Sequence, residues 1–290
     1  MAAKWLRSGW TVAACSVLLV GSVLGCVAYL QREVLLARWE LRGWLHGNNG
    51  NRRLEWLRQH HAVVLPAAAS ALASNDPAVC RRAGTLIRVI LDKLGDPTDP
   101  DAAQMSLVAV AKLRDEYPHL IAEGRKQATE AAQVVLQIHL RRWSPHVPTV
   151  LESAGAVFAA ALDDSESTVK KCALQLAPSL WPAIAVDGSS GPLVREWMHD
   201  VYLAAAALMS SDDPSVRSAA AVACSTAPFA EYDFQFARLL VDDDPEVRRS
   251  VLFALAQSDR PRLQGAEKQL VAPNLGDADA AMAGAAERRL

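Results

Sequence analysis

The chain has 290 residues, a formal net charge of −2 and a hydrophobic fraction of 51%. The 30 basic residues are balanced by 32 acidic ones, so the sequence lacks the basic excess typical of nucleic-acid binding, and we expect no nucleic acid among its partners. Aromatic residues make up only 6%, which favours packed helices over sheets.

The first predicted element is a membrane span. Residues 1–10 form a short tail, and residues 11–30 contain no charged side chain. About 20 apolar residues are needed for a helix to cross the hydrocarbon layer. Trp10 and Tyr29 stand at the two ends, where interfacial aromatic residues are common. We therefore predict a single-pass transmembrane helix at 11–30 that contacts the lipid bilayer.

Three other interpretations of this segment stay open. Lys4 and Arg7 ahead of an apolar run also describe a cleaved secretory signal. The sequence Val23-Leu24-Gly25-Cys26 resembles a bacterial lipobox, with Cys26 as the acylated residue. A buried helix of a soluble protein is the third. Basic residues flank the run in near balance, so the positive-inside rule does not set its orientation. We expect a single-pass membrane protein of a bacterium. A short amino-terminal tail tends to stay inside, which gives a weak preference for the large domain outside the cytoplasm.

Residues 31–50 follow as a juxtamembrane helix and a linker. Apolar and charged residues alternate at helical spacing from Gln31 to His46. This helix either lies on the bilayer surface through Trp39 and Trp44 or covers the first repeat of the domain that follows. Gly47-Asn48-Asn49-Gly50-Asn51 is a helix breaker and predicts the domain boundary.

From residue 51 to 290 the pattern predicts helices in pairs and no strand. Ala185 to Pro192 is expected to be a loop, and the tail from Ala272 an alanine-rich half unit. The expected helices are Arg52–Asn75, Asp76–Gly95, Ala102–Tyr117, Gly124–Trp143, Thr149–Leu162, Thr168–Trp181, Leu193–Met209, Pro214–Cys224, Tyr232–Val241 and Pro245–Ala256.

One phrase occurs twice near the end of the chain. Asp213-Pro214-Ser215-Val216-Arg217 and Asp244-Pro245-Glu246-Val247-Arg248 lie 31 residues apart. The aspartate is a favourable N-cap, the proline suits the first helical position, and the valine begins a buried stripe at helical spacing. A period of a few tens of residues is typical of stacked repeats.

Further copies occur upstream and downstream. Asp76-Pro77-Ala78-Val79 matches closely, with Arg81 one place late, and the copy around Val169 lacks the proline. Val79 and Val169 are 90 residues apart, so we expect a degenerate unit between them, with a helix from Gly124 to Arg141. Asp279 opens a last, weak echo.

These residues resemble the HEAT-repeat family, in its HEAT-like form. In that family each repeat is two antiparallel helices, the turn between them contains Asp-Pro, and the second helix opens with Val-Arg. The resemblance implies an all-α fold, with an α-solenoid of about five HEAT-like hairpins over 51–290. It also implies a ladder between neighbouring repeats through Asp213, Arg217, Asp244 and Arg248. The repeat-motif residues are Asp76, Pro77, Val79, Val169, Asp213, Pro214, Val216, Arg217, Asp244, Pro245, Val247 and Arg248.

No group of residues predicts catalysis, so we expect a protein that is not an enzyme and has no catalytic, cofactor-binding or metal-binding residues. The histidines form no His-Glu-x-x-His motif. Asp242-Asp243-Asp244 lacks the ligand pattern of a calcium loop and fits helix capping. No Cys-x-x-Cys pair occurs among the five cysteines, which are Cys15, Cys26, Cys80, Cys172 and Cys224.

Stacked helix pairs offer an extended concave face suited to a protein partner. We therefore expect a membrane-anchored scaffold for protein–protein interaction, with an unknown protein bound on the solenoid. The alternatives are a lipoprotein or a purely structural envelope component. A further alternative is an accessory to an enzyme like the bilin lyases, because some HEAT-like proteins resemble those enzymes.

Overall fold

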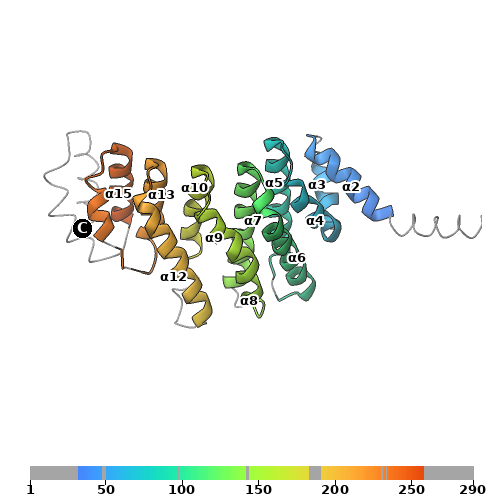
Figure 1. Ribbon diagram of the computed structural model, residues 1–290. Helices are drawn as coiled ribbons and strands as arrows, with labels where there is room; N and C mark the ends of the chain where they lie inside the picture. Colours follow the sequence, from blue (N-terminus) through green and yellow to red (C-terminus); the bar gives the residue numbers. More distant parts are fainter. Residues whose placement is uncertain are drawn as a thin grey trace, which may run out of the picture. The chain divides into compact units, whose positions relative to one another are not determined.

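The computed structural model describes residues 32–47, 50–96, 98–141, 144–182, 191–229, 231–232 and 234–257. The regular elements within these ranges are helices, and no strand occurs among them (Figure 1). The fold class is therefore all-α, as predicted. The chain divides into two compact units, Met1–Ala67 and Ala68–Leu290.

The first unit contains a pair of packed helices. α2 (Arg32–Leu45) contacts α3 (Asn51–Gln59), and the side chains of Leu41, Trp44 and Leu57 are buried. Arg53 on α3 forms an ion pair with Glu40 on α2. α4 (His61–Ala71) extends through the boundary between the units.

Gly47 follows directly after α2 and has a φ of 98°. This left-handed conformation is the usual way to end a helix and reverse the chain, and it favours glycine because a Cβ atom would clash there. The predicted linker at 47–51 therefore contains a turn between two packed helices of the same unit.

The second unit contains the other described helices. In chain order they are α5 (Pro77–Leu94), α6 (Pro100–Glu116), η1 (Tyr117–His119), α7 (Ala122–Arg141), α8 (Val147–Val150), η2 (Leu151–Gly155), α9 (Ala156–Leu162), α10 (Ser167–Leu176), η3 (Ala177–Ser179), α12 (Pro192–Ala207), η4 (Leu208–Ser210), α13 (Pro214–Ser225), α14 (Phe234–Leu239) and α15 (Pro245–Gln257).

Five helices of the second unit form one row, which we call the second-helix row. α5 contacts α7, α7 contacts α10, α10 contacts α13 and α13 contacts α15 (Figure 1). The helices that precede them pack alongside: α6 contacts η2, and α9 contacts α12. Successive helix pairs therefore contact mainly their neighbours in the sequence.

The helices of this row share one register. The third residue of each helix is buried and belongs to the core; these residues are Val79, Gly124, Val169, Val216 and Val247. Gly124 takes the place of valine in α7 because α7 approaches the backbone closely there. A Cβ atom at Gly124 would lie 2.5 Å from the carbonyl oxygen of Leu72. The degenerate unit expected at Gly124 therefore shares the valine register.

The prediction of a single-pass membrane protein is corrected. Within the described residues, no helix combines the length and the apolar character needed to cross a bilayer. The two longest, α5 and α7, are amphipathic helices with charged residues on one side, such as Arg88 and Glu130. The predicted span at 11–30 and the acylated Cys26 lie outside the described residues.

Two other expectations differ from the structure. The single helix expected over Arg52–Asn75 is divided at His60 into α3 and α4, and Pro66 lies inside α4. The loop expected over Ala185–Pro192 ends earlier, because Pro192 already begins α12. Its residues 185–190, the half unit from Ala272 and the echo at Asp279 lie outside the described residues.

Candidate functional site

The turn before α13 is joined to the next turn by an arginine. Arg217 donates from Nε and Nη2 to the two carboxylate oxygens of Asp242, at 2.9 and 2.8 Å. Its Nη1 donates to the carbonyl oxygen of Ser211 at 2.8 Å. Only 17% of the Arg217 side chain and 11% of the Asp242 side chain are exposed. This bidentate geometry is the strongest form of ion pair.

The same arrangement occurs between α7 and α10, two steps earlier in the row. Arg125 donates to both carboxylate oxygens of Asp164, at 2.6 and 3.1 Å, and to the carbonyl oxygen of Leu120 at 2.7 Å. Arg125 and Arg217 are each the fourth residue of their helix. A ladder of arginine–aspartate pairs therefore joins neighbouring helix pairs at these two places.

The ladder uses different aspartates from those that the resemblance implies. Asp213 and Asp244 cap their own helices, since each accepts a hydrogen bond from the amide two residues later, at 2.8 and 2.7 Å. The acid that pairs with Arg217 is Asp242, two residues before the cap. Arg248 donates to the carbonyl oxygens of Asp242 and Asp243. Asp76 also caps its helix, α5.

The cap at Asp213 also contacts the preceding repeat. Hydrogen bonds from the hydroxyl of Ser167, at the start of α10, and from Ser215 lower the pKa of Asp213 to about 2. Burial tends to raise the pKa of Asp242, but the hydrogen bonds from Arg217 and the amide of Asp244 outweigh it and hold that pKa below its ordinary value. Both carboxylates are therefore ionised at neutral pH.

A thiol takes the arginine's place in α5. Cys80 is the fourth residue of that helix, and its Sγ lies 3.3 Å from the carbonyl oxygens of Leu72 and Ser74. Burial raises the pKa of this thiol, so it is not a nucleophile at neutral pH. Arg81, one place later, forms a long ion pair with Glu123 at 3.8 Å.

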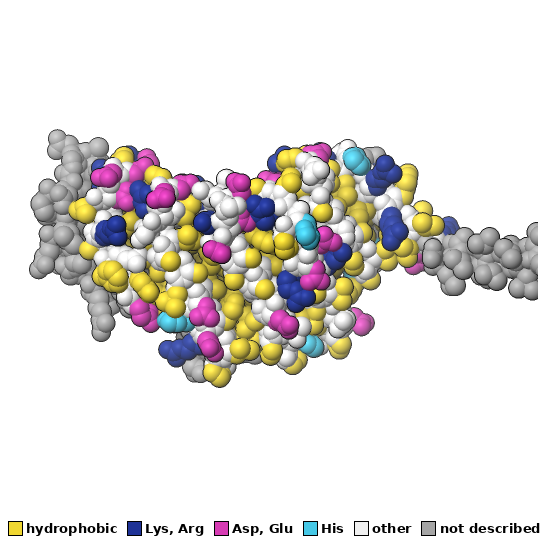
Figure 2. All heavy atoms as spheres, in the orientation of Figure 1, with side chains coloured by type: hydrophobic (Ala, Val, Ile, Leu, Met, Phe, Trp, Pro, Cys, Tyr) yellow, Lys and Arg dark blue, Asp and Glu magenta, His cyan; other side chains and the backbone are white. Residues whose placement is uncertain are grey.

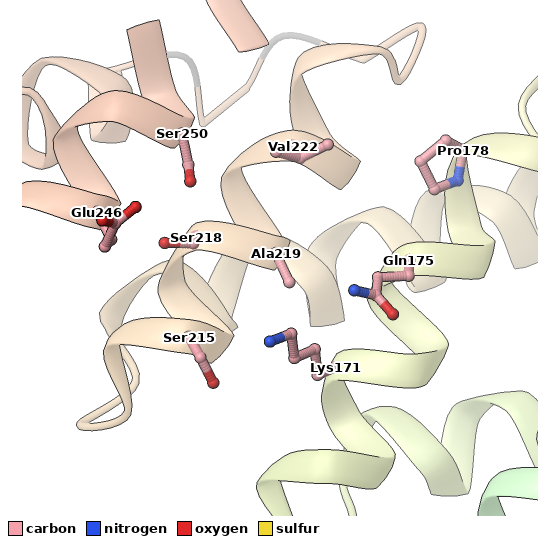
Figure 3. A pocket seen from close by; sticks show the side chains of 9 residues that line it. All are labelled: Lys171, Gln175, Pro178, Ser215, Ser218, Ala219, Val222, Glu246 and Ser250. Carbon is pink, nitrogen blue, oxygen red and sulfur yellow. The ribbon is translucent and has the colours of Figure 1, made fainter. Parts of the chain in front are cut away.

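A groove lies over the last three helices of the row. Its volume is about 490 Å³, and small side chains of α13 leave it open between α10 and α15. Figure 3 shows Lys171 extending from α10 toward α13, and Ser218 pointing toward Glu246 of α15. The lining residues are Lys171, Gln175, Pro178, Ser215, Ser218, Ala219, Val222, Glu246 and Ser250.

The groove presents charged groups, hydrogen-bonding groups and an apolar floor. Lys171 and Glu246 supply opposite charges on opposite walls, and serine hydroxyls and the Gln175 amide supply both donors and acceptors. Ala219 and Val222 supply an apolar floor. Amide, hydroxyl and small apolar groups together match a polypeptide, whose backbone needs donors and acceptors in alternation.

One buried histidine lies away from the groove. His139 of α7 is 1% exposed, and its Nε2 lies 2.9 Å from the hydroxyl of Ser106 on α6. Burial, with a smaller effect of nearby His146, lowers the pKa of His139 to about 4. The imidazole is therefore neutral at physiological pH and part of the core.

Buried Cys172 is equally unreactive. Its thiol lies 3.9 Å from Glu130, and burial together with that carboxylate raises the pKa of the thiol to about 12. Within the described ranges, His, Cys, Asp and Glu side chains form no group that could hold a metal ion.

Comparison with known proteins adds little. No family model matches this chain, and no curated protein matches it. Among solved structures, the crystal structure of an engineered protein is 18% identical, covers 78% of this chain and 94% of its own, and gives a TM-score of 0.47. A likeness of that size transfers neither a fold nor a function to this chain.

Proposed function

We propose that the second unit is an α-solenoid of about five HEAT-like hairpins that binds a protein partner on its second-helix row and catalyses no reaction. The proposal is supported by the shared register of α5, α7, α10, α13 and α15, in which the third residue is buried. It is also supported by the ladder through Arg125 and Arg217, which fixes one helix pair against the next. A solenoid built from such pairs presents an extended surface of side chains from successive repeats.

The observation that favours binding is the groove over α10, α13 and α15. Its floor residue Ala219 and its central Ser218 are half-buried and small, whereas Lys171 and Glu246 stand on either side. A hollow of about 490 Å³ has room for side chains of a partner. Over the face seen in Figure 2, acidic and basic side chains are interspersed with hydrophobic ones.

Site-specific crosslinking tests this proposal. A photoreactive amino acid replaces Ser218 in the groove, and in a matched control it replaces Val108 of α6, which is 45% exposed and belongs to the other set of helices. We expect one discrete protein adduct from position 218 in extracts of the native cells, and none from position 108.

A third variant checks that the groove itself is occupied. Ala219→Trp fills the floor with a large ring and is expected to abolish the adduct formed from position 218. Equal adducts from both positions, or an adduct that persists when the groove is filled, would contradict the proposal.

A further inference from the structure

A line of basic side chains crosses the second-helix row. The fifth residue of each helix is Arg81, Lys126, Lys171, Ser218 and Arg249, in the order in which the helices contact one another. Four of these five side chains are cationic, and the exception, Ser218, lies in the groove. The line of cations is therefore interrupted where the groove opens.

The face that contains this line is positively charged. We call it the second-helix face: residues two, five, six and nine of the five helices, and residue twelve of the four that are long enough, which form one stripe along each helix. It contains six basic residues and three acidic ones, a net charge of +3 (6 − 3), whereas the whole chain has −2. The basic residues are Arg81, Arg82, Arg88, Lys126, Lys171 and Arg249, and the acidic ones are Glu123, Glu130 and Glu246.

Each acidic residue of the face already has an arginine partner. Glu123 pairs with Arg81, Glu130 with Arg88, and Glu246 with Arg249. Lys126 and Lys171 make no ion pair with any residue in the described ranges. Two neighbouring, half-exposed ammonium groups are thus left for a partner to neutralise.

We infer that the second-helix face binds an extended, acidic segment of a protein partner; this inference rests on the proposed function. Packed helices lie about 8–10 Å apart. An extended chain in the polyproline II conformation advances about 3.1 Å per residue and completes a turn every three residues. Side chains three residues apart therefore lie on the same side of the segment and span about 9 Å, the spacing from one helix to the next. A segment with acidic side chains three residues apart therefore places one carboxylate at Lys126 and the next at Lys171.

The groove sets the residue that follows. Three residues beyond the carboxylate at Lys171, the segment reaches Ser218, where the line of cations is interrupted. An apolar side chain at this place enters the groove and lies on Ala219 and Val222. The expected recognition pattern thus has an acidic residue, a second acidic residue three places later and an apolar residue three places after that.

Fluorescence anisotropy with the full-length chain tests this pattern. The probe is a labelled 12-residue peptide of glycine and serine with aspartates at its third and sixth positions and a leucine at its ninth. Lys126→Glu and Lys171→Glu are each expected to weaken its binding about tenfold, because each variant removes an attraction and adds a repulsion. The affinity is also expected to fall as the salt concentration rises.

Two controls match these variants. Arg195→Glu makes the same change of charge at an exposed position of α12, outside the row, and is expected to leave binding unchanged. A peptide with lysines in place of both aspartates is expected not to bind the wild-type chain, but to bind the Lys126→Glu and Lys171→Glu double variant. Such an exchange of preference cannot result from misfolding.

Other outcomes overturn the inference. One is equal binding of the acidic and basic peptides, and another is tight binding of an oligo-dT strand without binding of either peptide. Self-association of the chain that Lys171→Glu abolishes would make a second copy the occupant and would also overturn it. If a crosslinked adduct forms from position 218 while the lysine variants bind the peptide normally, the scaffold proposal stands and the acidic segment alone is refuted.

Discussion

The ladder between neighbouring turns offers the sharpest test of how this fold is stabilised. Arg217→Ala removes the bidentate pair with Asp242 and the hydrogen bond to the carbonyl oxygen of Ser211. Both members of the pair are largely buried, with 17% and 11% of their side chains exposed. Breaking a buried pair by removing one partner costs about 3–5 kcal/mol. Because water still reaches this pair in part, we expect about 3 kcal/mol, the lower end of that range.

Two neighbouring arginines provide graded controls. Arg248 donates to the carbonyl oxygens of its own turn at 2.7 and 3.2 Å, so Arg248→Ala is expected to cost about 1 kcal/mol. Arg249 pairs with exposed Glu246 one turn earlier in the same helix, and Arg249→Ala is expected to cost under about 0.5 kcal/mol.

Urea unfolding followed by circular dichroism measures the three costs. The free energy of unfolding should fall in the order Arg217→Ala, then Arg248→Ala, then Arg249→Ala, with the largest loss first. Equal losses for Arg217→Ala and Arg249→Ala would refute the conclusion that the Arg217–Asp242 pair joins successive repeats.

The remaining predictions concern packing and pH. Gly124→Ala is expected to destabilise the protein by about 1–3 kcal/mol, because the added Cβ would meet the carbonyl oxygen of Leu72; this cost outweighs the helix preference of alanine. Gly191→Ala is the control, because its Cβ would meet open space, and it should be near neutral. Thermal melts of the two variants compare these costs. The fold lowers the pKa of His139 to about 4, so between about pH 6.5 and 4 the unfolded chain binds more protons than the folded one. The free energy of unfolding should therefore fall by about 2 kcal/mol on acidification from pH 7 to 5. His139→Gln should remove that part of the pH dependence in urea titrations at the two pH values, whereas a variant of exposed His119 should keep it; the same slope in both variants would show that another group titrates.

Local sequence chemistry made much of the fold predictable. Aspartate followed by proline marks a helix start without reference to the rest of the chain, so the beginnings of α5, α13 and α15 could be located closely. The spacing from Val79 to Val169 was enough to locate α7, although that helix has neither the proline nor the valine. A break at His60 was not predictable, because the residues on both sides favour a helix and only packing decides where α3 ends.

The candidate site was much less predictable. Asp242 and Asp164 look like surface acids, and their role depends on an arginine 25 or 39 residues away in the sequence. The fourth-residue arginine was a usable signal, but which aspartate it contacts depends on how the turns stack. Lys171 and Ser218 gain their meaning only once α10 and α13 are adjacent, since neither belongs to a motif.

The affinity for the crosslinked partner tests most directly whether the second-helix row is the binding surface. Calorimetry would compare the purified wild-type chain with Ala219→Trp in the groove and Val108→Trp on α6. We predict that Ala219→Trp weakens binding at least about tenfold, whereas Val108→Trp leaves it unchanged. Equal affinity for all three proteins, or a loss with Val108→Trp alone, would contradict the assignment of the second-helix row as the binding surface.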